Sequence, residues 1–310
     1  MNREQESEEY SRGRHRFVQV TAACTFLLLI VGGLVTSNDA GLAVPDWPLS
    51  YGTWLPPMVG NIVYEHGHRM VAAFVGLLTV IVAVWLWLRE PRRWVRRLGL
   101  AALAAVIAQG LLGGITVLFL LPRPVSIAHA SLAQIFFCLM VSLAVVTGPG
   151  WRTEAVRTDD TGKPPLVDLA SVTTLVIFVQ LILGAAYRHS ALDVLPHLVG
   201  AVVVTILVIR AVRRIRQRHT RQTPLRRAAW LLAGLLTLQL FLGLGAYLTQ
   251  LAAAKTSQPP TDMVALTVAH LAVGALLLAT SVALTLHAHR LLARPGEAVS
   301  LSAAGEEAAA

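Results

Sequence analysis

The chain has 310 residues, of which 55% are hydrophobic and only 14% are charged, and its mean hydropathy is +0.63. A soluble domain carries about a quarter charged residues, so this composition argues against a soluble protein and predicts an all-α polytopic membrane protein. The formal net charge of +9 would suit a nucleic-acid-binding protein, but the distribution of the basic residues gives it another explanation.

Eight apolar segments follow a polar tail of residues 1–16, and each has about the 20 residues that a helix needs to cross a bilayer. The predicted transmembrane helices cover residues 17–37, 63–88, 97–121, 125–147, 167–187, 195–212, 227–250 and 261–289. A linker of residues 148–166 separates two halves of four helices each, residues 17–147 and 167–289. Residues 290–310 are predicted to be a disordered tail. No cleavable signal peptide is expected, because the first apolar segment is too long for one.

Arginine and lysine are concentrated in alternate connections. The connection after the sixth helix reads RAVRRIRQRHTRQTPLRR, whereas the opposite loops carry only Arg69, Arg123, Arg188 and Lys255. By the positive-inside rule both termini are cytoplasmic, in the inner (plasma) membrane of a cell. The positive charge therefore reflects topology, and no nucleic-acid partner is expected. Cys24 and Cys138 lie within apolar segments and indicate neither a disulfide nor a Cys-rich metal site.

A short pattern recurs in three odd-numbered helices. It is Gln-x-x-Leu-Gly, beginning at Gln109, Gln180 and Gln239, and the first helix has a looser version in LLIVGGLVTSN. Small residues allow close helix packing in lipid, and a buried glutamine can bridge helices or meet a polar ligand group. The repeat predicts two pseudo-symmetric four-helix bundles.

Each even-numbered helix has a histidine near its outer end at a comparable place: His68, His129, His197 and His270. The four side chains are therefore expected at one level in the outer half of the membrane. A single intramembrane histidine can be a packing residue. Ionisable groups inside a bilayer are costly and usually functional, so four of them at one level favour a function.

Two histidines on facing helices suit axial ligation of a haem iron, and two such pairs predict two porphyrin sites, one in each half. Zinc or copper is the competing interpretation. A closed metal site usually gathers three or four ligands at one point, often with Cys or carboxylate. The two-plus-two grouping favours haem, while the spacing alone leaves the pairing open.

The segment EHGHR places ionisable side chains at the start of the second helix. Glu65, His68 and Arg69 share one helix face through their i, i+3 and i+4 spacings. His66 lies about 200° around the helix from His68, so it is expected to face the interface or a neighbouring helix. Glu65 can titrate, pair with Arg69 or stabilise positive charge on a substrate, and these alternatives stay open. In the second half, Val194 takes the place of the acid.

The first outer loop, SNDAGLAVPDWPLSYGTWLPPMVGN, is rich in Pro, Gly and Trp. Its tryptophans are either anchors at the membrane interface or part of a lid over the first porphyrin site. The sequence leaves both interpretations open.

Several of these segments, GGLVTSNDAGLAVPDWP, EHGHR, SIAHASLAQ, QLILGAAYRHS and VAHLAVGAL, resemble the haem A synthase family over about residues 15–290. The resemblance implies an eight-helix membrane enzyme with haem B as cofactor. Such an enzyme oxidises the C8 methyl of haem O to a formyl group, giving haem A for cytochrome oxidase.

The resemblance also implies roles for individual residues. His68 and His129 match the pair that lines the haem O site, His197 and His270 match the pair that ligates haem B, and Glu65 matches the carboxylate that acts in the oxidation. Many bacterial members have two cysteines in the first outer loop, and Val44 and Ser50 stand in their places here. Any mechanism that needs those thiols is therefore in doubt for this chain.

The expected partners are haem O, a haem O synthase, an electron donor and the lipid bilayer, and a homo-oligomer is left open. A dihaem cytochrome for electron transfer needs the same histidines but not Glu65. A haem carrier needs only one pair. A metal-ion transporter is disfavoured by the lack of carboxylates across the inner half.

Overall fold

The structure is a computed structural model, and it describes residues 11–151, 155, 157–253, 256 and 258–294. Within these ranges, eight helices are long and apolar enough to cross a membrane. They are α2 (Arg12–Ser37), α3 (Ile62–Arg89), α4 (Arg93–Leu118), α5 (Arg123–Val146), α6 (Leu166–Arg188), α7 (Val194–Arg218), α8 (Thr223–Ala253) and α9 (Thr261–Leu291). The prediction of an all-α polytopic membrane protein with eight transmembrane helices is confirmed.

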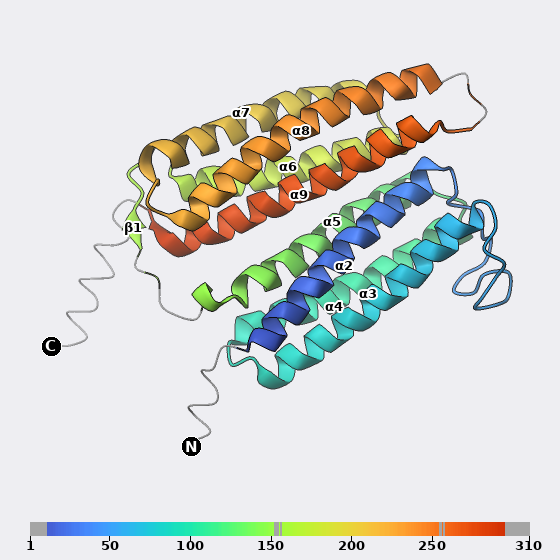
Figure 1. The fold of residues 1–310 in the computed structure, drawn as a ribbon, viewed down its shortest axis with the longest axis horizontal. Coiled ribbons are helices and arrows are strands. Elements are labelled where there is room, and N and C mark those ends of the chain that lie inside the picture. Colours follow the sequence, from blue (N-terminus) through green and yellow to red (C-terminus); the bar gives the residue numbers. More distant parts are fainter. Residues whose placement is uncertain (1–10, 152–154, 156, 254–255, 257, 295–310) are drawn as a thin grey trace.

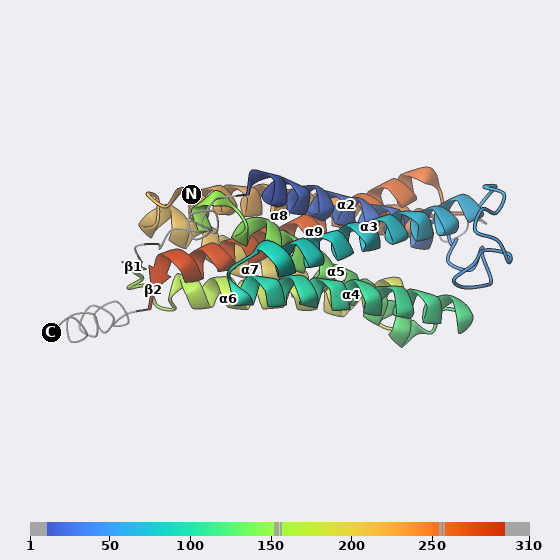
Figure 2. The ribbon, with the colours of Figure 1, turned by 90° about the horizontal axis from the view of Figure 1, so that it is seen from below.

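The helices form two groups of four that lie side by side (Figures 1 and 2). In the first group, α2 and α4 each contact both α3 and α5, and in the second group α6 and α8 each contact both α7 and α9. The groups meet where α5 contacts α6 and where α2 and α5 contact α9. The contact with α9 includes a buried apolar cluster of Leu29, Phe137, Ala275 and Ala279. In each group, therefore, the two histidine-bearing helices stand diagonally opposite each other.

Apolar side chains fill the cores of both groups and also cover their outer surfaces. Phe74 is 53% exposed, Leu88 70% and Phe241 70%. Large apolar patches of this kind mark a surface that is covered by another apolar phase, which for helices of this length is the hydrocarbon of a bilayer.

Four helices begin at a proline or at a capping side chain. The N-cap positions of α5, α6 and α9 are Pro122, Pro165 and Pro260, because proline disfavours a helical residue before it and fixes its own φ. α2 begins at Arg12, inside the segment expected to be a polar tail, because the side chain of Ser11 accepts the N–H of Arg14 and caps the helix.

Some helices extend beyond their apolar segments. α7 continues to Arg218, past the expected end at residue 212, and α8 begins at Thr223 rather than at residue 227. Arginine is a good helix former, and its side chain reaches solvent while the backbone stays helical. The length of an apolar segment therefore predicts how much of a helix lies in the membrane, and it does not predict where the helix ends.

The linker between the halves is joined to the last helix. Strand β1 (Thr158–Asp159) pairs in parallel with β2 (Leu292–Ala293), and Leu292 and Ala293 are buried. The expectation of disorder for residues 290–310 is wrong for residues 290–294, because burial and strand pairing hold them. From residue 295 onward that expectation lies outside the described residues.

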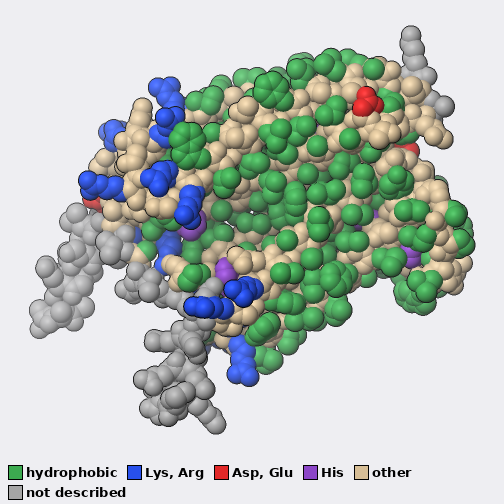
Figure 3. All heavy atoms as spheres, viewed as in Figure 1, with side chains coloured by type: hydrophobic (Ala, Val, Ile, Leu, Met, Phe, Trp, Pro, Cys, Tyr) green, Lys and Arg blue, Asp and Glu red, His purple; other side chains and the backbone are tan. Residues whose placement is uncertain are grey.

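Basic side chains gather at the end of the molecule that holds β1, while hydrophobic side chains cover most of the visible face beyond them (Figure 3). At this end Glu90, directly after α3, pairs with Arg14 at 3.1 Å and with Arg92 at 2.7 Å. Burial raises the pKa of Glu90, but the hydrogen bond and charge of Arg92 and the charge of Arg14 outweigh it, so the pKa is lowered. The cytoplasmic location of this end remains a prediction.

Candidate functional site

All four predicted histidines rest against a glycine of the preceding helix. A Cβ atom built on each glycine would lie only about 3 Å from the imidazole Cε1. The distances are 3.1 Å for Gly32 and His68, 3.2 Å for Gly113 and His129, 3.0 Å for Gly184 and His197, and 2.8 Å for Gly243 and His270. The glycines of the repeated pattern thus provide the space that each imidazole occupies. The glycines are therefore packing residues, and the side chain that each one packs against is a predicted site histidine.

Three of the histidines also contact the glutamine of the repeat. Gln109 Nε2 donates to the backbone oxygen of His129 at 3.0 Å and lies 3.3 Å from its Nε2. Gln180 Nε2 donates to the backbone oxygen of His197 at 2.8 Å and lies 3.1 Å from its Nδ1. Gln239 differs, because its Nε2 lies 3.2 Å from Nε2 of His270 and its own backbone oxygen lies 3.2 Å from Nδ1 of that ring. The glutamines therefore connect a helix to the histidine of the next one.

The histidines form two pairs across the diagonals of the bundles. The ring centroids of His197 and His270 are 6.2 Å apart, with an interplanar angle of 76°. Two imidazoles that bind one metal ion, each at about 2 Å from nitrogen to metal, have ring centres about 6 Å apart. His68 and His129 lie on α3 and α5, the diagonal helices of the first group, and each rests against a glycine of the preceding helix. Half-buried imidazoles paired in this way fit axial ligation of a haem iron.

A closed zinc or copper site finds no support in the described part of the chain. No group of three or more His, Cys, Asp or Glu residues there is arranged to hold a metal ion. Cys24 and Cys138 are both free thiols. The donor set thus fits a planar cofactor with two open axial positions better than a bare ion.

Glu65 is buried and points toward the first outer loop. Its Oε2 accepts the N–H of Val44 at 2.7 Å, and its Oε1 accepts Nη2 of Arg69 at 2.7 Å. The ion pair with Arg69, one of the alternatives that the sequence leaves open for Glu65, is present. Sequence reasoning missed the contact with the loop.

Arg69 fixes the loop through backbone oxygens. Its Nη1 donates to Asp46 at 2.7 Å and to Leu49 at 2.8 Å, and its Nη2 donates to Val44 at 3.3 Å. One guanidinium thus ties three points of the loop to α3, as its forked donors allow.

His66 does not face the membrane interface. Its Nδ1 is hydrogen-bonded to the hydroxyl of Ser50 at 2.8 Å, and both residues are buried. The predicted place of His66, at the interface or against a neighbouring helix, is therefore wrong, because the loop folds back over the start of α3 and covers that face. The positions of the family's loop cysteines, Val44 and Ser50, are both held by side chains of the EHGHR segment.

The loop also reaches α4. The indole of Trp47 lies against Gly114, where a built Cβ would be 2.7 Å from the ring. Gly114 directly follows the glycine that His129 contacts. Within the loop, Asp46 accepts the N–H groups of Gly52 at 2.8 Å and Tyr51 at 2.7 Å, and the hydrogen bond from Gly52 is the main cause that lowers the pKa of Asp46.

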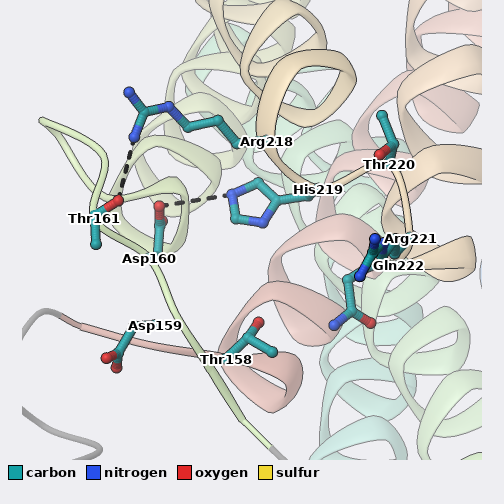
Figure 4. A pocket seen from close by; sticks show the side chains of 9 residues that line it. All are labelled: Thr158, Asp159, Asp160, Thr161, Arg218, His219, Thr220, Arg221 and Gln222. Atoms are coloured by element: carbon teal, nitrogen blue, oxygen red, sulfur yellow. Dashed lines mark hydrogen bonds and ion pairs between the residues drawn. The ribbon is translucent and has the colours of Figure 1, made fainter.

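A separate hollow of about 500 Å³ lies at the opposite end of α7 from His197. Figure 4 shows its lining, where Asp160 points toward His219 at 3.6 Å and Arg218 donates to Thr161. Burial lowers the pKa of His219 although Asp160 opposes this. The hollow joins the linker to the α7–α8 connection and contains none of the predicted site residues.

The fold and the paired histidines define a multi-pass membrane protein with two pairs of half-buried imidazoles, one in each group of four helices. The sequence model for the cytochrome oxidase assembly protein family matches residues 15–195. The chain belongs to this family.

Curated relatives carry one functional name. The chain is 30% identical to a haem A synthase of Symbiobacterium thermophilum, with 70% of this chain and 81% of the relative covered. It is 24% identical to a haem A synthase of Geobacillus kaustophilus, with 72% and 78% covered. A haem A synthase of Alkalihalophilus pseudofirmus is 30% identical, with 41% and 44% covered.

Proposed function

We propose that the protein is a haem A synthase, which oxidises a methyl group of haem O to the formyl group of haem A. The observation that carries this proposal is the presence of two diagonal histidine pairs, each packed against repeated glycines, in a chain related to haem A synthases over most of its length.

The two pairs take different haems in this proposal. His68 and His129 bind the substrate, haem O, and His197 and His270 bind a resident haem B. The conversion of a methyl to a formyl group removes four electrons, which no side chain here can accept, so bound haem supplies the redox chemistry. The chain's own residues bind, orient and shield the porphyrins.

Glu65 is the proposed catalytic group. It lies one helical turn before His68 on the same face of α3, and Val194 occupies the corresponding place in the other half. Its carboxylate is buried beside Arg69, where a fixed charge acts more strongly than in water. In this position Glu65 holds a proton or stabilises positive charge near the substrate.

The first outer loop acts as a lid over the substrate pair. Two contacts support this role. Trp47 lies on the glycine next to the one that His129 contacts, and Glu65, His66 and Arg69 hold the loop against the start of α3. A closed loop keeps water from the reacting carbon.

The proposal places the enzyme in the plasma membrane with both termini in the cytoplasm, as the arginine-rich connections predict. Haem O carries a long apolar tail, so it enters sideways from the lipid. A haem O synthase and an electron donor are the expected partners.

Co-expression with a source of haem O, followed by extraction and chromatography of the pigments, tests this function. Haem A that appears only with the intact protein is the expected result. Haem B alone, with no haem A under any condition, would favour a dihaem cytochrome or a haem carrier instead.

Two variants separate chemistry from loop attachment. Glu65→Gln should keep both haems but form no haem A, because the amide retains the size and loses the charge. Ser50→Ala, the matched control, removes the contacts of the loop hydroxyl with His66 and Arg69 and leaves Glu65 in place, so haem A formation should persist. Full activity in Glu65→Gln would remove this carboxylate from the mechanism.

A further inference from the structure

The hollow between the linker and the α7–α8 connection is lined by polar side chains alone. It measures about 500 Å³, and its lining consists of residues 158–161 of the linker and residues 218–222 of the connection. An apolar ligand would leave these side chains without hydrogen-bond partners, which is costly. The hollow therefore suits a charged or strongly polar ligand.

The two carboxylates of the lining are not free to bind a cation. Oδ1 of Asp160 accepts the N–H of Gly162 at 3.2 Å, and its Oδ2 accepts the N–H of Leu166, the first residue of α6. Asp160 thus lies at the positive end of that helix. Asp159 points away from the other side chains of the lining (Figure 4).

Most of the remaining groups at the hollow are hydrogen-bond donors. Nη1 of Arg218 donates to the hydroxyl of Thr161 at 3.2 Å, and the other nitrogens of this guanidinium can serve a further acceptor. Arg221 adds a second positive charge. Residues 220–222 lead directly into α8, which has 31 residues, so the positive end of this helix also lies at the hollow. Donors and positive charge in this arrangement suit an anion.

His219 gives an independent indication of a ligand. Its side chain is only 7% exposed, and its buried Nε2 makes no hydrogen bond with any described residue. Oδ1 of Asp160 lies 3.6 Å from this nitrogen, which is too long for a hydrogen bond. The other ring nitrogen faces the side of the hollow that holds Thr158 and Gln222 (Figure 4). Because buried polar groups are nearly always hydrogen-bonded, such an imidazole favours a site that takes a polar ligand.

The hollow lies at the arginine-rich end of the molecule (Figure 3), near the level at which the helices leave the lipid. Trp230 on α8 is 58% exposed, and the guanidinium of Arg216 lies 5.0 Å from its ring centre. Exposed tryptophan is typical of the membrane–water interface, and α8 begins only about 10 Å before it along the helix axis. Basic pockets on the cytoplasmic side of membrane proteins bind lipid headgroups, and this end is the expected cytoplasmic one.

We propose that the hollow is a phosphate-binding site, with Arg218, His219, Arg221 and the start of α8 as its donors. The phosphate belongs either to the headgroup of an anionic lipid or to a small soluble phosphate. Its binding joins the linker to the α7–α8 connection and so holds the segment between the two groups of four helices. The site is separate from the histidine pairs, and it does not depend on the proposed function.

Hydrogen exchange of the full-length protein in nanodiscs, measured by mass spectrometry, tests the proposal. Discs of phosphatidylcholine alone are compared with discs that also contain phosphatidylglycerol and with the first discs after addition of inorganic phosphate, all at one ionic strength. A ligand that binds only the closed form lowers the open population by the factor 1 + [L]/Kd. Inorganic phosphate at about ten times its Kd should therefore slow exchange in peptides that cover residues 158–166 about tenfold.

Arg221→Gln removes one donor and leaves the printed fold contacts intact, because Arg221 is exposed. It should weaken phosphate binding about tenfold, which is the effect of losing one charge-assisted hydrogen bond. Arg227→Gln is the matched control. Arg227 is also exposed and lies on α8 outside the lining, so this variant loses the same charge and should bind phosphate as the parent protein does.

The two probes distinguish the sources of the phosphate. Slower exchange with inorganic phosphate supports a site that is open to soluble phosphate, and slower exchange with phosphatidylglycerol alone supports a headgroup site. No slowing with either probe would overturn the proposal. Equal slowing in Arg221→Gln and Arg227→Gln would also overturn it, because binding would then follow the net charge of this end and not the hollow. The measurement needs no bound haem, so a failure of the proposed function leaves its result unchanged.

Discussion

Removal of the Arg69 guanidinium should free the first outer loop and leave the eight helices in place. The guanidinium donates to the backbone oxygens of Asp46, Leu49 and Val44 and to the carboxylate of Glu65. Only 16% of the Arg69 side chain and 5% of the Glu65 side chain are exposed. In Arg69→Met the carboxylate would stay buried without its counter-charge, and three carbonyls would lose a charged donor.

The magnitude follows from this burial. Breaking a buried ion pair by removing one partner costs about 3–5 kcal/mol, and the partial exposure of Arg69 places the cost near the lower end. Each 1.4 kcal/mol is a factor of ten, so about 3 kcal/mol raises the open population of the loop roughly 100-fold. Helix amides, which do not depend on Arg69, should be unaffected.

Hydrogen exchange measured by mass spectrometry on protein in nanodiscs gives the direct measurement. Peptides that contain Tyr51 and Gly52 should exchange about 100 times faster in Arg69→Met, and Arg69→Lys should lie between because lysine keeps the charge but not the forked donors. The control is Arg294→Met, which removes a largely exposed pair with Asp168 and should change nothing in the loop. Loop exchange within threefold of the parent rate would show that the guanidinium does not hold the loop.

Three further expectations concern the basic end and the second pair. Glu90→Gln should lower the free energy of unfolding by about 3–5 kcal/mol, because two arginines lose their buried partner; chemical denaturation in detergent measures it, and an unchanged midpoint would contradict it. Because the pKa of Glu90 is lowered, its stabilisation is present above the ordinary glutamate pKa and is lost as pH falls through the lowered value, which denaturation at several pH values follows. Gly243→Ala should displace the ring of His270 and reduce haem content in absorbance spectra, whereas Gly234→Ala on the same helix meets no atom within 4 Å and should not.

The sequence predicted the helices well where the membrane alone decides their length. The expected segments 63–88 and 167–187 differ by one residue at each end from Ile62–Arg89 and Leu166–Arg188. It failed at α7, where RAVRRIRQR continues the helix into the aqueous phase. The length of an apolar segment predicts the part of a helix that crosses the bilayer. Whether the helix continues into the aqueous phase depends on contacts with other parts of the chain.

The histidines were predictable as a set because ionisable residues inside a membrane are rare, and their recurrence with Gln-x-x-Leu-Gly is visible by eye. Their diagonal placement was not, since it follows from which helices become neighbours. The looser form of the repeat in the first helix is also visible in the sequence. It gains meaning only once Gly32 is found against His68, because that contact shows that α2 repeats the geometry of the other three helices.

The loop attachment shows what residue patterns omit. Arg69 binds the loop at three backbone oxygens, and a carbonyl is offered by every residue type, so no side-chain pattern encodes the contact. Glu65 likewise binds the N–H of Val44, which needs no cysteine there, whereas the contact of His66 with Ser50 needs a polar side chain. A loop held at these points does not require the disulfide that the family's cysteines would allow. With valine and serine at these two positions the loop is attached by Glu65, His66 and Arg69, so in the proposed function Glu65 has a share in the attachment of the loop as well as the chemistry.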